Sequence, residues 1–460
     1  MSSSEHKNHQ RTYFRSDFTK GQTLVFDEQA LADDFDNAAA KYYEGNKDLS
    51  KLLADFRNVT YLDLAVLINF TALFLRRREN NQETFIGISK NKRVRDFIRV
   101  WRFPEAFFEA TATRFETILV QDDQHYRGEK QDTYTGVGSG IEALEFDSEW
   151  TNGSQTKRNF FEFTSFNLVR EQAESFSTIP RGEGSRWNKV LIRQVLTTHL
   201  DGDNQSDEVA RVVIYESLSN AVRHPNATII QTVSKFDWHE KPDELTSSRS
   251  EKPSVSTTGR SLRGHLRIYI WDDGESIVDT LLPTVRVGGP LRGVKLPNYM
   301  YDSIHLDIRD AANKRMSLLR VSQMEDPPPD ASEELILLCS LFPGVTRSLR
   351  RLVQPVQPFD TVTPDAAPIE LADKQGMGLY ALTRTALDLY QGSLLIRSGN
   401  HRLVMEVAHD SYRVQHNVTY KAKITRYPES FPKFRGNLLG IMLPIRMVAR
   451  EDVTTNINDD

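Results

Sequence analysis

The feature that most constrains this chain is an apolar strand that ends abruptly in charge. Residues 268–271 read Ile-Tyr-Ile-Trp, and Asp272, Asp273 and Gly274 follow them directly. The apolar run predicts a buried strand, and the glycine lets the backbone turn sharply after it. A carboxylate at the end of a buried strand suits recognition of an exocyclic amine in a closed pocket, although the same residues could equally form a hairpin turn.

A polar stripe runs along the helix that we predict before this strand. The sequence ESLSNAVRHPNA starts at position 216. At about 100° per residue, one side of that helix carries four polar side chains, namely Glu216, Asn220, Arg223 and His224. One helix therefore presents a carboxylate, an amide oxygen and a cation to the same space. Taken alone, the pattern is better explained by a solvated charged face.

Two glycines open another predicted helix, over residues 377–389. They occur in the sequence KQGMGL, which starts at Lys374. Glycines at a helix start let exposed N–H groups approach phosphate oxygens, and the positive end of the helix dipole favours the same ligand. A Gly-x-Gly pair alone is a weak signal.

Together and in this order, the three blocks resemble the ATP-binding fold of the GHKL superfamily over residues 186–448. That superfamily includes gyrase-type topoisomerases, heat-shock chaperones, mismatch-repair ATPases, histidine kinases and anti-sigma serine kinases. ESLSNAVRHPNA is similar to its motif E-x-x-x-N-A-x-x-H, DDGES to its adenine motif D-x-G-x-G, and GMGL to its second glycine motif. The later strands GSLLIRSGNHRLVMEV and GNLLGIMLPI fit its closing sheet. One departure is Ser276, which stands where the adenine motif usually has its second glycine.

The resemblance implies a role for each motif residue. Glu216 would act as the catalytic general base, and Asn220 would ligate Mg²⁺ between the phosphates. Asp272 would accept the adenine amino group, and Gly274 would permit the turn under the base. The other implied ATP-binding residues are Arg223, His224, Lys374, Gly376, Met377, Gly378 and Leu379. For His224, a packed and hydrogen-bonded helix histidine is an equally good interpretation.

Strands alternate with helices in the N-terminal region, which predicts a small α/β layer. Asp63 is expected to cap a helix over residues 64–75 that closes with Arg76–Arg78. The order strand, aspartate, apolar helix, strand and NKRVRDFIRVWRFPEAF is similar to the STAS domain of anti-sigma-factor antagonists. A serine after the aspartate is often the phosphate acceptor in that family. Leu64 follows Asp63 here, which speaks against a phospho-switch, and an unrelated α/β module is the alternative.

These patterns predict an α/β (α+β) protein with a STAS-like domain before a GHKL (Bergerat) sandwich. Residues 277–375 would form an unusually long ATP lid and insertion, with a helical stretch near 311–320 and an apolar helix at 335–342. Pro444 is expected to stop the last strand. The predicted order is a disordered tail at 1–20, the STAS-like domain at 21–122, a linker at 123–184, the ATP-binding domain at 185–449 and an acidic tail at 450–460.

Composition narrows the classes of partner. The 58 Lys and Arg residues against 63 Asp and Glu residues give a formal charge of −5, so nucleic acid is not indicated as a partner. Cys339 is the single cysteine, which excludes an intramolecular disulfide and a cysteine-based zinc site, and we expect it to be a packing residue. Without a secretory signal or an apolar stretch of about 20 residues, we expect a cytoplasmic protein with no membrane contact.

We therefore predict an ATP- and Mg²⁺-binding protein, most simply a slow ATPase that acts as a conformational switch. An anti-sigma-type serine kinase is one alternative, and a non-catalytic ATP-binding regulator, suggested by Ser276, is another. His199 is the candidate phosphoacceptor of a histidine kinase, but Asp201 and Gly202 end its helix, which speaks against that class. The expected partners are a nucleotide and a protein or second copy bound through the N-terminal domain or the lid.

Overall fold

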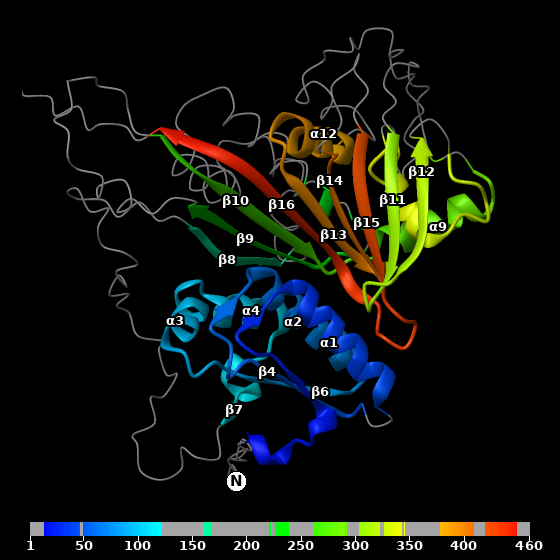
Figure 1. The fold of residues 1–460 in the computed structure, drawn as a ribbon. Coiled ribbons are helices and arrows are strands. Elements are labelled where there is room, and N and C mark those ends of the chain that lie inside the picture. The colour runs from blue at the N-terminus through cyan, green and yellow to red at the C-terminus, as the bar shows by residue number, and fades with distance from the viewer. Residues whose placement is uncertain are drawn as a thin grey trace, which may run out of the picture.

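The residues that the structure describes form both helices and strands, as the sequence predicts. The structure is a computed structural model, and it describes residues 13–46, 49–121, 160–167, 217, 220, 221, 224, 226–238, 261–289, 291, 303–322, 326–342, 345, 378–408 and 419–448. In this part of the chain the elements form four layers (Figure 1), which are helices, a large sheet, further helices and a small sheet. The predicted mixture of helices and strands is therefore confirmed.

Residues 13–121 form what we call the N-terminal unit. Among its described residues, three parallel strands make the small sheet, in the order β2 (Thr23–Val25), β4 (Lys51–Asp55) and β6 (Glu83–Gly87). Two more parallel pairs join β1 (Tyr13–Phe14) to β7 (Val120–Gln121) and β3 (Gln29–Ala30) to β5 (Tyr61–Leu62). Its helices are α1 (Ala32–Gly45), α2 (Leu64–Glu79), α3 (Lys92–Val100) and α4 (Phe103–Thr111), with short 3-10 turns η1 (Arg15–Asp17), η2 (Lys20–Gln22) and η3 (Phe115–Ile118).

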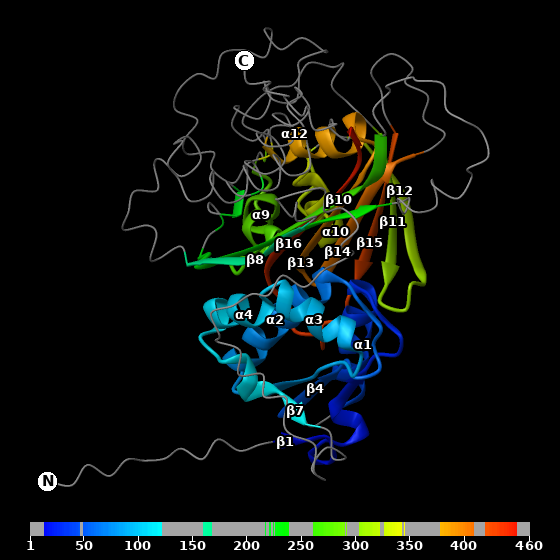
Figure 2. The same ribbon diagram turned by 90° about the vertical axis from the view of Figure 1, so that its left-hand side faces the viewer.

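Helix α2 shows how the sequence builds this unit. Asp63 caps its start as predicted, because the carboxylate accepts the Ala65 N–H at 2.9 Å, and Arg76–Arg78 lie in its last turn. Nearly all of its side chains are buried, since the helix lies between the small sheet and the large sheet (Figure 2). A helix that is apolar on almost every side is stable only in such a position.

The large sheet has nine strands among the described residues, in the order β12-β11-β15-β14-β13-β16-β10-β9-β8. Neighbouring strands are antiparallel except for β11 and β15, which are parallel. The predicted pairing of β9 (Ile229–Trp238) with β10 (Ser261–Asp272) is confirmed. The other strands are β8 (Phe160–Asn167), β11 (Ser303–Asp310), β12 (Arg315–Ser322), β13 (Ser393–Gly399), β14 (His401–Val407), β15 (Thr419–Arg426) and β16 (Phe434–Val448).

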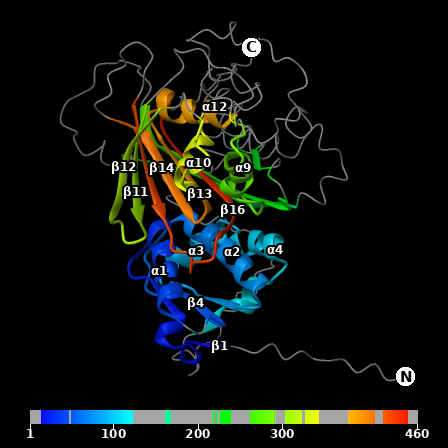
Figure 3. The same ribbon diagram turned by 90° about the vertical axis from the view of Figure 1, so that its right-hand side faces the viewer.

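Different parts of the chain cover the two faces of the large sheet (Figures 2 and 3). On β10, Ile268 and Ile270 belong to the core beneath the C-terminal helices, whereas Trp271 belongs to the core shared with α1 and α2. The apolar run at 268–271 is therefore explained by burial on both faces. The helices on the face opposite the N-terminal unit are α9 (Ile277–Arg286), α10 (Glu333–Cys339), α12 (Gly378–Arg384) and the π-helix η11 (Thr385–Leu389).

Residues 303–322 form a hairpin, within the segment 277–375 that we expected to be a lid and where we expected a helix at 311–320. Strands β11 and β12 pair antiparallel, and Asn313 in their turn has a φ of 63°. Ile304, Leu306 and Ile308 alternate with polar residues along β11, and this period of two places all three in the core. This alternation, which starts before residue 311, indicated a strand more strongly than residues 311–320 indicated a helix.

The apolar helix expected at 335–342 does form, as α10, slightly earlier in the chain. Ile336, Leu337 and Leu338 are fully buried in the same core, so the helix packs on its own chain. Cys339 is 1% exposed and is the packing residue that we expected.

Pro444 does not end the last strand, contrary to the prediction. β16 continues to Val448, and Pro444 pairs with His265 of β10. On its other side, β16 pairs with β13 only as far as Met442, so Pro444 lies where β16 has one neighbour. A proline is tolerated there because no second ladder requires its missing N–H.

Two segments that we expected outside the domains belong to the fold. Residues 13–20, assigned to a disordered tail, include β1 and η1, and residues 160–167, assigned to the linker, form the strand β8 beside β9. The junctions expected near 122, 184 and 449 lie outside the described residues. None of the described helices has the length and apolar character needed to cross a membrane.

Candidate functional site

Side chains from separate parts of the sequence meet in one pocket on the helix-covered face of the large sheet. The pocket is partly open, and its volume of about 30 Å³ is room for about two water molecules. Four of the predicted site residues, Asn220, His224, Asp272 and Leu379, line it. Its other lining residues are Ser217, Ala221, Ile270, Ile277, Ile396, Asn437, Leu438 and Leu439.

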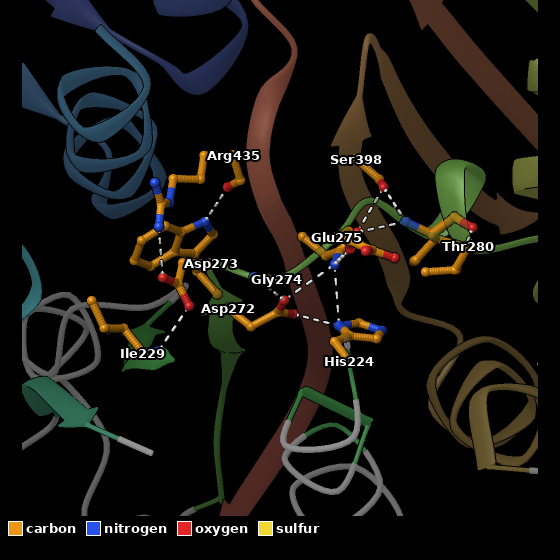
Figure 4. Close-up of polar contacts among 12 residues, drawn as sticks. His224, Ile229, Asp272, Asp273, Gly274, Glu275, Thr280, Ser398 and Arg435 are labelled. Carbon is orange, nitrogen blue, oxygen red and sulfur yellow. Dashed lines mark hydrogen bonds and ion pairs between the residues drawn. The ribbon is translucent and has the colours of Figure 1, made fainter. Parts of the chain in front are cut away.

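Asp272 is the polar centre of this pocket, at the C-terminal end of β10. It is 2% exposed, and its Oδ2 lies 2.7 Å from His224 Nδ1. Its Oδ1 accepts the Gly274 N–H at 3.0 Å and an Asn437 side-chain N–H at 3.2 Å (Figure 4). A carboxylate can accept about four hydrogen bonds, so these three contacts leave room for one further donor.

His224 contacts Asp272, as expected for a packed and hydrogen-bonded histidine. Its side chain is 20% exposed, and Nδ1 faces both Asp272 Oδ2 and, at 3.1 Å, Asn437 Nδ2. Nδ1 can donate to the carboxylate in one tautomer or accept from the amide in the other. With Nδ1 protonated, the imidazole donates to the Asp272 carboxylate and helps to fix that side chain.

Asn437 of β16 is a site residue that the sequence reasoning missed. Its Nδ2 also donates to the Glu275 carbonyl at 2.8 Å, while its Oδ1 accepts the Ile277 N–H at 3.0 Å and the Ser398 hydroxyl at 2.7 Å. One buried amide thus links β10, the start of α9 and β13. An asparagine within the otherwise apolar run GNLLGIML was the available signal.

Gly436 explains how β16 comes so close to the turn after β10. Its φ is 76°, a region that favours glycine, and a Cβ at this position would overlap the carbonyl oxygen of Asp272. The glycine therefore lets the next residue, Asn437, reach the Asp272 side chain.

Asp273 points away from the pocket, although it adjoins Asp272 in the sequence. Its carboxylate accepts both the N–H and the hydroxyl of Thr228 at 2.6 Å and the Ile229 N–H at 2.8 Å. Arg435 Nη2 lies 3.0 Å away. Burial raises the pKa of Asp273, while these hydrogen bonds oppose the rise. Asp273 is thus an anchor of the turn.

Ser276 takes a regular conformation despite occupying the position of the motif's second glycine. Its φ is −65°, so the backbone requires no glycine. Its hydroxyl accepts the Asp279 N–H at 3.0 Å and donates to the Asp279 carboxylate at 2.7 Å, which caps α9. The departure from the motif therefore replaces a flexible residue with a helix cap.

The remaining predicted site residues differ in how far they can be placed. Asn220 lines the pocket, and its Nδ2 is buried without a hydrogen-bond partner among the described residues. Gly274 lies in the turn after β10, and Gly378 begins α12, which carries Leu379 into the pocket. Glu216, Arg223, Lys374, Gly376 and Met377 lie outside the described residues.

Comparisons of the chain with protein-family models, with curated proteins and with solved structures give no significant match. A function for this protein therefore has to be inferred from its pocket and its motifs.

Proposed function

We propose that the pocket binds ATP with Mg²⁺ and that the protein is a slow, GHKL-type ATPase that acts as a conformational switch. The observation that carries this proposal is the convergence of three sequence blocks on one pocket. Asn220 and His224 come from the first block, Asp272 from the second and Leu379 from the third. A solvated helix face and two unrelated turns would have no reason to meet.

The base would bind at Asp272. The carboxylate can accept one more donor, which suits the exocyclic amine of adenine, and Ile270, Ile277 and Leu379 supply apolar walls. The pocket volume of about 30 Å³ is smaller than a purine. Binding would therefore require the pocket to widen, as a conformational switch needs.

Asn220 would hold the metal. The metal would bind through the amide Oδ1, and the buried Nδ2, which has no hydrogen-bond partner among the described residues, could donate to a phosphate oxygen. Mg²⁺ would supply charge neutralisation at the phosphates. Glu216 precedes Asn220 by four residues, which places both on one side of a helix, and it would orient the attacking water as general base.

Contacts of the N-terminal unit favour hydrolysis over phosphorylation of that unit. Asp63 Oδ1 lies 3.4 Å from the Tyr269 hydroxyl, and Asp63 Oδ2 lies 3.8 Å from Arg267 Nη1. Leu64, which follows it, is 3% exposed. If this unit is STAS-like, the position after Asp63, where that family often carries its phosphate acceptor, is buried on the side that faces the large sheet. Under the alternative hypothesis of a serine kinase, the substrate would be a serine on a separate protein.

Titration of the full-length protein with ATP and Mg²⁺ by calorimetry tests the site. Asp272→Asn should abolish binding, because the amide replaces one of the two accepting oxygens with an N–H donor, which faces the base amine when the remaining oxygen accepts the Gly274 N–H. Asp307→Asn is the matched control, since Asp307 pairs with Arg309 and Arg315 on the β11–β12 hairpin. Equal ATP affinity in the Asp272 variant and the wild type would overturn the assignment.

A further inference from the structure

Three consecutive residues of β16 hold both aspartates of the turn from opposite faces of the large sheet. Asn437 reaches Asp272 on the pocket face, while Arg435 reaches Asp273 on the face of the N-terminal unit. Figure 4 shows Arg435 with Asp273 and His224 with Asp272 as separate contacts. Gly436 lies between them and lets the backbone touch the Asp272 carbonyl. The position of β16 at this point therefore sets the position of the whole turn.

Arg435 also contacts the N-terminal unit. Its Nη1 forms an ion pair with Glu79, the last residue of α2, while its Nη2 binds Asp273. The Trp271 indole N–H donates to the Arg435 carbonyl at 2.9 Å, which fixes the backbone as well. We call the chain of contacts Glu79–Arg435–Asp273 the arginine relay. It joins the end of α2 to the turn that carries the proposed base-binding residue.

A second set of contacts runs beside the relay. Arg76 Nε donates to the Lys433 carbonyl at 3.1 Å, and Lys433 Nζ lies 2.9 Å from Asp279 in the first turn of α9. The last turn of α2 is therefore linked to both sides of the turn at 272–279. Arg435 of β16 links it to Asp273, and Lys433, in the connection between β15 and β16, links it to Asp279.

The charges around Arg435 make its position sensitive to α2. Glu79 and Asp273 attract the guanidinium, whereas Arg76 and Arg78 lie close enough to repel it. Burial lowers the pKa of Arg435, and those two arginines lower it further. Without Glu79, Arg435 would face two cations on α2 and would be pushed away from its place beside Asp273.

We infer that Arg435 is a positioning residue through which the N-terminal unit regulates nucleotide binding. The inference rests on the proposed ATP site. A shift of α2 would move Arg435, which would in turn move the turn and Asp272. By reciprocity, nucleotide binding would shift α2. The protein that binds the N-terminal unit would thereby control ATP affinity without touching the pocket.

Hydrogen exchange of the full-length protein tests the relay without any nucleotide. Glu79→Gln removes the attraction for Arg435 at a site that is 41% exposed, so the fold should survive. Exchange at the Gly274 and Ile277 amides, both bonded in the turn, should become at least about fivefold faster. Arg402→Gln is the control, because it breaks an ion pair with Asp33 that crosses the same boundary away from the turn.

Calorimetry with ATP and Mg²⁺ supplies the second measurement. Glu79→Gln should weaken ATP binding at least about fivefold, with an unchanged urea midpoint. Arg435→Lys, which keeps the positive charge, should bind ATP more tightly than Arg435→Gln. Adding Glu79→Gln to Arg435→Gln should have no further effect. If Glu79→Gln behaves like Arg402→Gln in both measurements, the relay is wrong. If the wild type binds no ATP, the proposed function fails, and the exchange rates still decide whether α2 positions the turn.

Discussion

Asp36 of α1 and Arg397 of β13 form a buried ion pair across the boundary between the N-terminal unit and the large sheet. Arg397 Nε lies 3.0 Å from Asp36 Oδ2, and neither side chain is more than 3% exposed. The Tyr427 hydroxyl donates to the same carboxylate oxygen at 3.1 Å, and the guanidinium lies 4.3 Å from the centre of the Tyr427 ring. The two parts of the chain are therefore packed as one body through a charged contact that neither part could bury alone.

Arg397→Met should lower the free energy of unfolding by about 3–5 kcal/mol, because it leaves the Asp36 carboxylate buried without a partner of opposite charge. Burial raises the pKa of Asp36 even with Arg397 present, so the loss should be smallest at acid pH and grow as the pH rises and Asp36 ionises. Urea unfolding measures both effects. The double variant Arg397→Met, Asp36→Asn should be more stable than the single one at pH 7, and an equal or lower stability would contradict this explanation.

Gly436→Ala should be strongly destabilising, since the new Cβ would overlap the Asp272 carbonyl oxygen and the residue has a φ of 76°. The left-handed conformation alone costs about 1–2 kcal/mol for alanine, and displacement of β16 adds to it. Gly45→Ala is the matched control, because nothing lies within 4 Å of its added Cβ at the end of α1. Thermal unfolding of both variants checks the prediction, which fails if their midpoints are equal.

Features that depend on neighbouring residues could be predicted from the sequence. The Asp63 cap, the basic last turn of α2 and the β9–β10 pairing follow from local patterns, and all three are confirmed. The apolar run at 268–271 also indicated burial correctly. It could not show that Trp271 would face a core shared with α1 and α2, because that core exists only once two distant parts of the chain meet.

Features that depend on distant partners were missed for the same physical reason. Asn437 has no local signature of its role, since its five contacts come from β10, α9, β13 and the helix motif. β8 carries four phenylalanines among its eight residues, but it lies within a longer polar segment, and it pairs at the edge of the sheet with the distant strand β9. The resemblance gave Asp272 a role and Asp273 none, because the contacts that make Asp273 an anchor come from residues distant in the sequence, Thr228, Ile229 and Arg435.

Glu216→Ala should retain ATP binding and lose phosphate release, because a general base acts on the water rather than on the bound nucleotide. The measurement is product analysis with γ-labelled ATP, in which the wild type should release free phosphate. Asp307→Asn on the β11–β12 hairpin, away from the pocket lining, is the control. Label on a protein serine would favour the kinase alternative, and unchanged phosphate release in Glu216→Ala would remove this residue from the catalytic role.

Glu334, at the start of α10, should make stability depend on pH in the acid range. Burial opposes its ionisation, but hydrogen bonds from His401, the helix backbone and Ser332 outweigh it and lower the pKa to about 2. A lowered pKa contributes stability above about pH 4.5 that is lost as the pH falls toward 2. Glu334→Gln should therefore unfold more easily than the wild type at pH 7, by about 1–2 kcal/mol given partial solvent screening, and the difference should close between pH 5 and pH 2. Glu333→Gln, which changes a 40% exposed side chain in the same turn, should follow the wild-type curve closely. Urea unfolding across this range decides the matter, because a difference that stays constant with pH would show that Glu334 acts through packing alone.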